Sequence, residues 1–333
     1  MEALATKYRP KTWDEMVSQD ATTKILTKQL ETGEIKNCYL FTGPAGTGKT
    51  TSARLFANAI NHGEGNPIEI DAASNNSVDD VRKIVEQSKY QSLNSDYRVY
   101  VLDEVHVFSN QAWQAMLKIL EEPPKKTIFI LCTTDPQKIP NTILSRVQRF
   151  QFTKIPLAEI VNRLNYILKS EGITSYDPNA VELIAKMANG GMRDAISHLE
   201  KSLSYTNELT VDSVVTAIGY TSYNDMFELL KAILAGDKLL VINSVESIYG
   251  SGIDLKQFVA QFTQFVLDLT TYNICKSFDY VNIPRSFENE VTQMTDQPTL
   301  LRLLDSLVKL IPQIKYESNP RNMVMATLLL FEV

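Results

Sequence analysis

Residues 43–50 read GPAGTGKT, and this short stretch decides the fold. It matches the pattern G-x-x-x-x-G-K-[ST] of a phosphate-binding loop. An apolar run, CYLFTG, precedes it from Cys38, and a helical pattern begins at Lys49. A strand, a glycine-rich turn and a helix in this order let backbone N–H groups and the positive end of the helix dipole converge on one anion. We therefore expect a nucleoside triphosphate site rather than a chance glycine-rich turn.

Further strand and helix patterns in the first half predict an α/β sheet. Buried strands are expected in PIEIDAA from Pro67, RVYVLDE from Arg98 and TIFILCTT from Thr127. Between them lie helical patterns, one from Val78 and one in NQAWQAMLKILEEPP, which its two prolines end. Strands that alternate with helices are typical of a parallel sheet covered on both faces.

After Pro156 the strand patterns give way to helical periodicity, as in PNAVELIAKMANGG and YNDMFELLKAILAGD. Gly219 marks a further break in this periodicity. The expected fold class is therefore α/β plus all-α. We predict a nucleotide-binding domain over residues 1–156 and two helical domains over 157–219 and 220–333.

The charge distribution limits the partners of the chain. Its 333 residues carry a formal net charge of −6. Residues 1–156 hold 19 Lys and Arg against 18 Asp and Glu, so the acidic excess lies in residues 157–333. A strongly basic DNA-wrapping surface is not expected, whereas local phosphate contacts remain compatible with this balance.

The composition also bears on metals and membranes. No apolar run is long enough for a membrane span or a signal peptide, so we expect a cytoplasmic protein with no membrane partner. The cysteines and histidines are spread along the chain without ligand spacing, so buried cysteines in a reducing compartment are expected rather than disulfides or zinc. They are Cys38, Cys132, Cys275, His62, His106 and His198.

An acidic pair follows the strand RVYVLDE. Asp103 is expected to hold Mg²⁺ together with the hydroxyl of Thr50, and Glu104 to orient an attacking water. Lys49 is expected to reach the β- and γ-phosphates. A carboxylate directly after the metal-binding aspartate favours hydrolysis over phosphoryl transfer. The alternative for the pair is helix capping.

Two threonines and two arginines complete the candidate set. Thr133 and Thr134 end a predicted strand, where their hydroxyls can sense a γ-phosphate or simply belong to the strand end. Arg193 follows a glycine pair at a predicted helix start, where a cation opposes the helix dipole. Arg146 lies in ILSRVQRF. Each arginine alone is weak evidence, because surface arginines are common.

These motifs, in this order, resemble an AAA+ ATPase, and more closely the gamma/tau subunit of the bacterial DNA polymerase III clamp loader. The resemblance is dense over residues 8–201 and weaker to the end, where NPRNMVMATLLLFE fits the last helix of the family. The segments that carry it are KYRPKTWDEMVSQD, IEIDAASNN, VYVLDEVHVFS, AMLKILEEPP, TTDPQKIPNTILSRVQRF and GGMRDAISHLEKS. It implies an AAA+ domain, a helical lid and a C-terminal helical collar.

The resemblance implies roles for individual residues. Thr134, with or without Thr133, matches the sensor on the strand. Arg193 matches the second sensor, which reads the nucleotide of its own subunit, and Arg146 matches the arginine finger, which reaches the ATP of a neighbouring subunit. The implied adenine pocket and phosphate loop comprise Tyr8, Arg9, Pro10, Val17, Gly43, Pro44, Ala45, Gly46, Thr47, Gly48, Lys49, Thr50 and Thr51.

The chain departs from the family in three respects. The family carries a four-cysteine zinc module after the phosphate-loop helix, whereas NAINHGEGNPIEI has no cysteine, so ATP and Mg²⁺ but no zinc are expected. The family sequence S-R-C reads Ser145-Arg146-Val147. The sequence ends at Val333 without the long family extension, which suggests a phage or otherwise reduced replication system.

By the same resemblance, ATP binding assembles several loader subunits, expected as a pentamer, around a sliding clamp and primer–template DNA. Hydrolysis then releases the clamp. The candidate DNA contacts at helix starts are Asn75, Asn76, Ser77, Arg82, Ser109 and Asn110. For Asn75, Asn76 and Ser77 the alternative is plain helix capping. Tyr90 and Leu93 are candidate clamp contacts or core residues.

Two other functions compete with this one. Another AAA+ machine, such as a branch-migration motor or the small subunit of an archaeal-type loader, would show DNA-driven ATPase activity without a clamp. A non-hydrolysing structural subunit of the loader would lack a working phosphate loop, whereas Lys49, Thr50 and Glu104 are all present.

Overall fold

The computed structural model describes residues 2–64, 66–90, 95–206, 208–294 and 296–332. The chain divides into two compact units. The first comprises Met1–Ile167 and Ala188–Ser197, and the second comprises Leu168–Met187 and His198–Val333. The three-domain division expected from the sequence stays a prediction.

The first unit contains all five strands of the sheet, which are β1 Cys38–Thr42, β2 Ile68–Asp71, β3 Arg98–Asp103, β4 Thr127–Thr133 and β5 Gln148–Gln151. Its helices are α1 Leu4–Lys7, α2 Asp20–Thr32, α3 Lys49–Ile60, α4 Val78–Ser88, α5 Asn110–Glu121 and α6 Asn141–Leu144. Short 3-10 turns are η1 Trp13–Glu15, η2 Val105–Val107 and η3 Pro136–Lys138. Helices α7 Leu157–Ser170 and α9 Met192–Tyr205 begin in this unit.

The strands pair in the order β2-β3-β4-β1-β5, and every pair is parallel. The four predicted strands are confirmed. The edge strand β5 was not predicted, because only Phe150 of its four residues is buried and the sequence QRFQ has no apolar run. Short, half-exposed edge strands carry little of the hydrophobic signal on which strand prediction depends.

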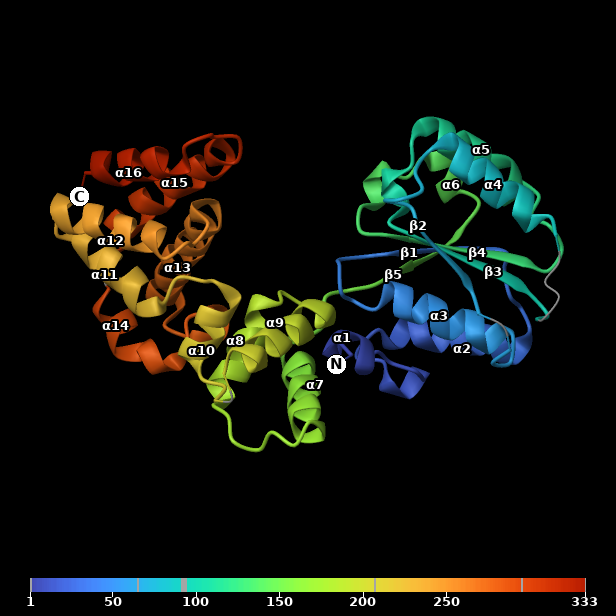
Figure 1. Cartoon of the computed structure of the whole chain (residues 1–333), viewed down its shortest axis with the longest axis horizontal. Coiled ribbons are helices and arrows are strands. Elements are labelled where there is room, and N and C mark those ends of the chain that lie inside the picture. The colour runs from blue at the N-terminus through green and yellow to red at the C-terminus, as the bar shows by residue number, and fades with distance from the viewer. Residues whose placement is uncertain (1, 65, 91–94, 207, 295, 333) are drawn as a thin grey trace. The chain divides into compact units, whose positions relative to one another are not determined.

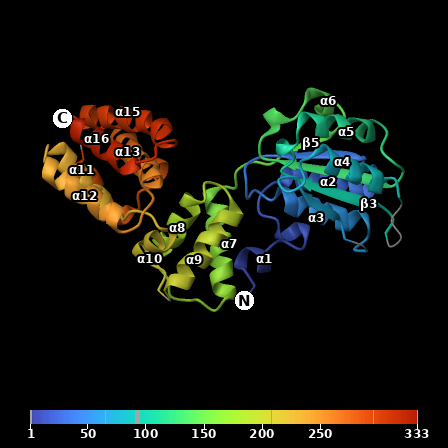
Figure 2. The same ribbon diagram turned by 45° about the horizontal axis from the view of Figure 1, so that its top comes forward.

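Side chains alternate between the two faces of the sheet and make two separate cores. On β1, Cys38 and Leu40 join the core beneath α4 and α5. Tyr39 and Phe41 join the opposite core beneath α2 and α3. Figures 1 and 2 show these two helical layers on either side of the strands. The predicted parallel sheet covered on both faces is therefore confirmed.

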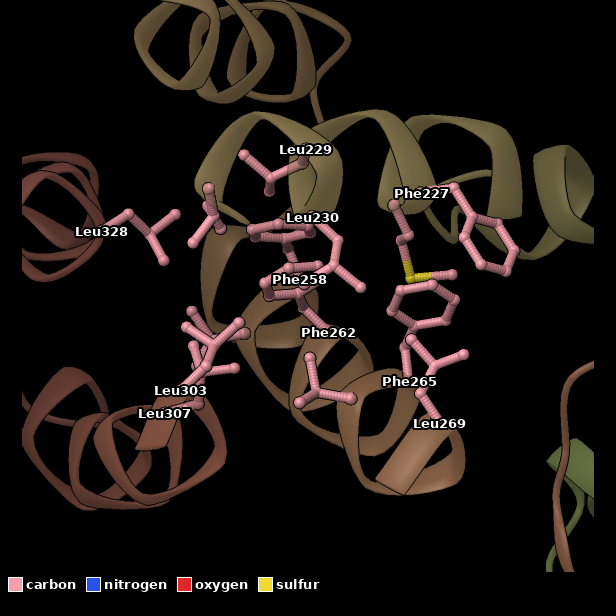
Figure 3. Packing of buried hydrophobic residues seen from close by; sticks show 14 of the residues in the cluster. Phe227, Leu229, Leu230, Phe258, Phe262, Phe265, Leu269, Leu303, Leu307 and Leu328 are labelled. Atoms are coloured by element: carbon pink, nitrogen blue, oxygen red, sulfur yellow. The ribbon is translucent and has the colours of Figure 1, made fainter. Parts of the chain in front are cut away.

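The second unit is helical, as predicted. Its helices are α8 Pro178–Met187, α10 Val211–Ile218, α11 Tyr223–Leu234, α12 Lys238–Gly250, α13 Leu255–Cys275, α14 Glu288–Gln293, α15 Gln297–Ile314 and α16 Pro320–Leu330, with turns η4 Phe278–Tyr280 and η5 Arg285–Phe287. The long helix α13 packs against α15 and α16, and Phe258, Phe262 and Phe265 lie at the centre of their core (Figure 3).

One acidic side chain of α13 is buried next to this core. Asp268 accepts hydrogen bonds from the backbone N–H of Asn282 at 2.9 Å and from Gln264 Nε2 at 2.8 Å. Burial raises the pKa of Asp268, and these hydrogen bonds partly oppose the rise. The contacts tie the chain after η4 back to α13.

Within the described residues, no helix is both long and apolar enough to cross a bilayer.

Helix α13 offers a matched test of its packing. Leu269 is 1% exposed and Leu267 is 40% exposed, two residues along the same helix. Leu269→Ala should lower the free energy of unfolding by about 2–5 kcal/mol, because it leaves a cavity in a close-packed core. Leu267→Ala should cost about 0.5 kcal/mol or less. Urea unfolding followed by far-UV circular dichroism measures both, and equal losses would contradict this packing.

Candidate nucleotide site

A cavity of about 260 Å³ opens at the carboxyl end of the strands, where the phosphate loop lies. Its lining brings together nearly all of the predicted nucleotide-binding residues, from three distant parts of the chain. They are Tyr8, Arg9, Pro10 and Val17, then Ala45, Gly46, Thr47, Gly48, Lys49, Thr50 and Thr51, and finally Arg193. Asp103 and Glu104 also line the cavity, whereas Gly43 and Pro44 lie outside its lining.

The phosphate loop requires glycine for two different reasons. Gly46 and Gly48 have φ of 70° and 99°, in the left-handed region that favours glycine. Gly43 has φ of 146°, and a Cβ there would lie 2.2 Å from the carbonyl oxygen of Phe152. At Gly43 the loop passes so close to the segment after β5 that there is no room for a side chain.

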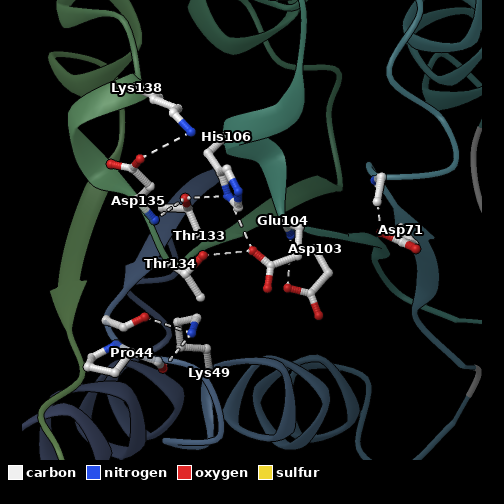
Figure 4. Close-up of polar contacts among 12 residues, drawn as sticks. Pro44, Lys49, Asp71, Asp103, Glu104, His106, Thr133, Thr134, Asp135 and Lys138 are labelled. Atoms are coloured by element: carbon white, nitrogen blue, oxygen red, sulfur yellow. Dashed lines mark hydrogen bonds and ion pairs between the residues drawn. The ribbon is translucent and has the colours of Figure 1, made fainter. Parts of the chain in front are cut away.

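Lys49 holds the loop closed. Its Nζ donates to the carbonyl oxygens of Gly43 and Pro44, both at 2.8 Å (Figure 4). Thr47 Oγ1 also donates to Pro44 O, at 2.8 Å. Burial lowers the pKa of Lys49, and the nearby Asp103 and Glu104 carboxylates oppose that change. The Lys49 ammonium group therefore lies inside the phosphate loop, bound to its carbonyl oxygens.

The two predicted magnesium ligands touch each other. Thr50, the second residue of α3, donates its hydroxyl to Asp103 Oδ2 at 2.7 Å. Asp103 ends β3, so α3 and β3 deliver one oxygen ligand each to the same point. A hydroxyl and a carboxylate beside a phosphate loop are the ligand types that suit Mg²⁺ in such sites.

Glu104 has an unusual backbone conformation, with φ of 52° and ψ of 38°. A non-glycine residue in this left-handed region is strained, and such strain is typical of functional sites. Its Oε2 accepts a hydrogen bond from Thr134 Oγ1 at 3.1 Å and lies 3.2 Å from His106 Nδ1 (Figure 4). Glu104 precedes η2 without a side-chain capping bond, so the capping alternative does not describe it.

Thr133 and Thr134 have different surroundings. Thr134 donates to Glu104, whereas the Thr133 hydroxyl accepts from the backbone N–H of Asp135 at 3.0 Å and faces His106 Nδ1 at 3.3 Å. The structure therefore distinguishes the two threonines, which the sequence analysis treated as a pair. His106 had no role in the sequence interpretation, because its contacts depend on the pairing of β3 with β4.

The start of α9 contacts the phosphate loop. The backbone N–H of Met192 donates to Gly46 O at 3.0 Å, and a Cβ on Gly46 would lie 3.0 Å from Gly191 Cα. Arg193, the second residue of α9, thereby reaches the cavity. Burial lowers the pKa of Arg9, and Arg54 and Arg193 add to the effect. Arg9 and Arg193 both line the cavity, so their guanidinium groups lie where an anion would bind.

Arg163 of α7 is a further cavity residue that sequence interpretation missed. Its Nη2 donates to Tyr8 O at 2.9 Å, which holds the N-terminal segment beside the cavity. Only the tertiary contact reveals this role, because an arginine on a helix carries no local signal.

Arg146 lies outside the cavity lining, just after α6. Its guanidinium pairs with the Glu121 carboxylate at the end of α5 and donates to Thr142 O. The structure therefore leaves Arg146 apart from Lys49 and Arg193.

The candidate DNA residues lie at the starts of α4 and α5. Ser77 accepts from the N–H of Asp80 and Ser109 from the N–H of Ala112, so both side chains cap their helices. Capping was the alternative stated for Ser77. Asn75 Nδ2 donates to Asp71 O, and Arg82 pairs with Asp79. Asn76 and Asn110 are exposed.

Of the candidate clamp contacts, Tyr90 is 71% exposed and Leu93 lies outside the described residues.

Three family models match consecutive parts of the chain. The model described as DNA polymerase III, delta subunit, matches residues 61–156. The DNA polymerase III clamp loader subunit, ATPase lid domain, matches residues 159–208. The DNA polymerase III subunits gamma and tau domain III matches residues 209–330.

Curated relatives agree with these matches. DNA polymerase III subunit tau of Bacillus subtilis is 33% identical over 96% of this chain and 61% of its own length. The tau subunit of Escherichia coli is 32% identical over 78% of this chain and 44% of its own length. The chain thus spans about half the length of the curated relatives it matches.

Among solved structures, the Thermotoga maritima RuvB Holliday junction branch migration motor superposes with a TM-score of 0.52 at 20% identity. The match covers 68% of this chain and 79% of that chain. Fold and site together therefore define an AAA+ nucleotide-binding protein. Within that class, the chain belongs to the family of DNA polymerase III gamma/tau clamp-loader subunits.

The close approach at Gly43 can be tested. Gly43→Ala should weaken nucleotide binding roughly ten- to hundred-fold, since overpacking against backbone costs about 1–3 kcal/mol. The control is Gly33→Ala, which also has positive φ but would meet nothing within 4 Å. It should cost about 1–2 kcal/mol of stability and leave binding unchanged. Titration of a fluorescent ATP analogue and thermal melts measure both effects. Unchanged affinity in Gly43→Ala would contradict the loop geometry.

Proposed function

We propose that the protein is an ATP-hydrolysing subunit of a DNA polymerase clamp loader, which uses ATP to load a sliding clamp onto primer–template DNA. One observation carries the proposal. A single cavity collects a closed phosphate loop with Lys49, a metal-ligand pair from Thr50 and Asp103, and a carboxylate, Glu104, held by Thr134.

The cavity residues fit ATP and Mg²⁺. The phosphate loop offers backbone N–H groups, and Lys49 would exchange its two carbonyl partners for phosphate oxygens. Thr50 and Asp103 would hold Mg²⁺, which neutralises charge on the phosphate oxygens when bound. Tyr8, Arg9, Pro10 and Val17 would enclose the adenine, and Arg193 would read the nucleotide from α9.

Glu104 would act on the attacking water. Its Oε2 has two neighbours, Thr134 and His106, whereas Oε1 has no hydrogen-bond partner among the described residues and is available to accept a proton. A carboxylate fixed in this way raises the effective concentration of the base at the reacting water.

Completion of the site in trans is supported by the place of Arg146. This residue lies outside the lining of the cavity in its own chain. A guanidinium supplied by a neighbouring subunit would stabilise charge on the transferring phosphoryl group, and hydrolysis would then depend on assembly. Other loader subunits in a pentamer, the clamp and DNA are the proposed partners, in the cytoplasm.

The DNA contacts proposed at α4 and α5 are of the phosphate-binding kind. Exposed helix starts at Ser77 and Ser109 present backbone N–H groups and neighbouring amides to a phosphate backbone without reading bases. Arg82 supplies one cation there, which would exchange Asp79 for phosphate. The expectation that the protein binds no zinc also stays a prediction.

The competing functions are less well supported. The likeness to the branch-migration motor is one of fold, at 20% identity, whereas gamma/tau relatives are 32–34% identical. A non-hydrolysing structural subunit does not account for the intact arrangement of Lys49, Thr50, Asp103 and Glu104.

The base assignment predicts the effect of Glu104→Gln. ATP affinity should change little, because the amide keeps the shape of the side chain. Turnover should fall by about two orders of magnitude or more, the usual scale for the loss of a general base. Steady-state ATPase assays and analogue titration measure the two quantities. Glu122→Gln, at an exposed glutamate, is the control, and unchanged turnover in Glu104→Gln would refute the assignment.

The trans assignment predicts complementation between two inactive variants. Arg146→Ala should bind ATP normally but lose stimulation by clamp and DNA, whereas Lys49→Ala should lose ATP binding. A mixture should regain activity, because an intact loop of one chain then meets an intact arginine of another. Arg149→Ala, at an exposed arginine nearby, should behave as wild type. Full stimulation in Arg146→Ala alone would overturn the trans mechanism.

A further inference from the structure

His106 is a partly buried histidine for which the proposed mechanism has no role. It lies on η2, directly after the acidic pair, and its side chain is 17% exposed. Its Nδ1 is 3.2 Å from Glu104 Oε2 and 3.3 Å from Thr133 Oγ1 (Figure 4). The histidine therefore stands between the candidate base and the end of β4.

The direction of these contacts follows from the chemistry of the groups. A carboxylate oxygen has only lone pairs, so Nδ1 carries the hydrogen in its contact with Glu104. The Thr133 hydroxyl accepts from the N–H of Asp135 at 3.0 Å, which fixes its oxygen beside the same nitrogen. A path of polar contacts thus runs from the backbone after β4 through Thr133 and His106 to Glu104.

Glu104 depends on such support. Its side chain is 37% exposed and stands on a strained left-handed backbone, so the direction of the carboxylate depends on the hydrogen bonds that it accepts. Two donors, Thr134 Oγ1 and His106 Nδ1, converge on Oε2. When the Thr134 hydroxyl turns toward a γ-phosphate, as its sensor role requires, His106 remains as the donor on Oε2.

We propose that His106 is a positioning residue for hydrolysis: its Nδ1–H holds Oε2 of Glu104, so that Oε1 faces the attacking water. The proposal rests on the proposed hydrolytic function. In many catalytic sites one group reacts, a second acts as its base, and a third orients the base by a hydrogen bond. Here the water, Glu104 and His106 would have these three roles.

The first experiment compares two substitutions at this position in the full chain. His106→Ala removes the donor and should lower kcat at least roughly tenfold, the scale on which misplaced catalytic groups lose rate, with KM unchanged. His106→Asn should restore most of kcat, because its Nδ2–H lies as many bonds from the backbone as Nδ1. Val107→Ala, on the same turn, is the control and should keep full kcat.

A double-mutant cycle separates positioning from a structural role. In the Glu104→Gln background, His106→Ala should cause no further loss, because the orienting bond then has no base to orient. A purely structural role would lower the melting temperature and reduce the turnover of both backgrounds alike. Full kcat in His106→Ala, or equal losses in both backgrounds, would overturn the proposal.

The two proposals fail in different ways. If Glu104→Gln loses turnover while His106→Ala does not, only the positioning role is wrong. If Glu104→Gln keeps full turnover, the hydrolytic assignment is wrong and the role of His106 falls with it.

Discussion

The parallel pairing of β1 and β3 with the central strand β4 is the constraint on which the nucleotide site depends. Parallel strands end at the same edge, and here the register pairs Thr42 with Thr133 and Leu102 with Leu131. The phosphate loop after β1, the acidic pair after β3 and the threonines after β4 therefore emerge side by side. A slip of one residue would move every side chain to the other face and disperse the site.

The polar side chains at this edge of the sheet are held in place by contacts with neighbouring groups of the site. Lys49 is held by carbonyl oxygens of the phosphate loop, Thr50 by Asp103, and Glu104 by Thr134 and His106. The contacts of Lys49, Thr50 and Thr134 use atoms that a nucleotide or a metal ion would engage. Binding would therefore replace one set of polar contacts by another, which limits the cost of desolvating the charged groups. A preorganised site of this kind needs little rearrangement to become active.

Particular residues show how far sequence interpretation reaches. The strands β1 to β4, the helices α3, α4 and α5 and the residues of the phosphate loop were predicted, because apolar runs and a fixed glycine spacing are local signals. Strand β5 was missed, since its single buried residue, Phe150, carries too weak a signal. Arg163 and His106 were missed for another reason, because Arg163 contacts Tyr8 and His106 contacts Thr133, partners that are distant in sequence.

The sequence by itself determined the class of fold, the nucleotide loop and the identity of the metal-ligand and base candidates. Spacing and hydrophobic period specify these features within about ten residues of chain. Only the tertiary structure decided that Thr134 rather than Thr133 holds Glu104, that Arg146 pairs with Glu121 away from the cavity, and that Asp268 is buried. These facts depend on which segments of the chain meet in space. Local sequence patterns do not reveal contacts between side chains that are distant in sequence.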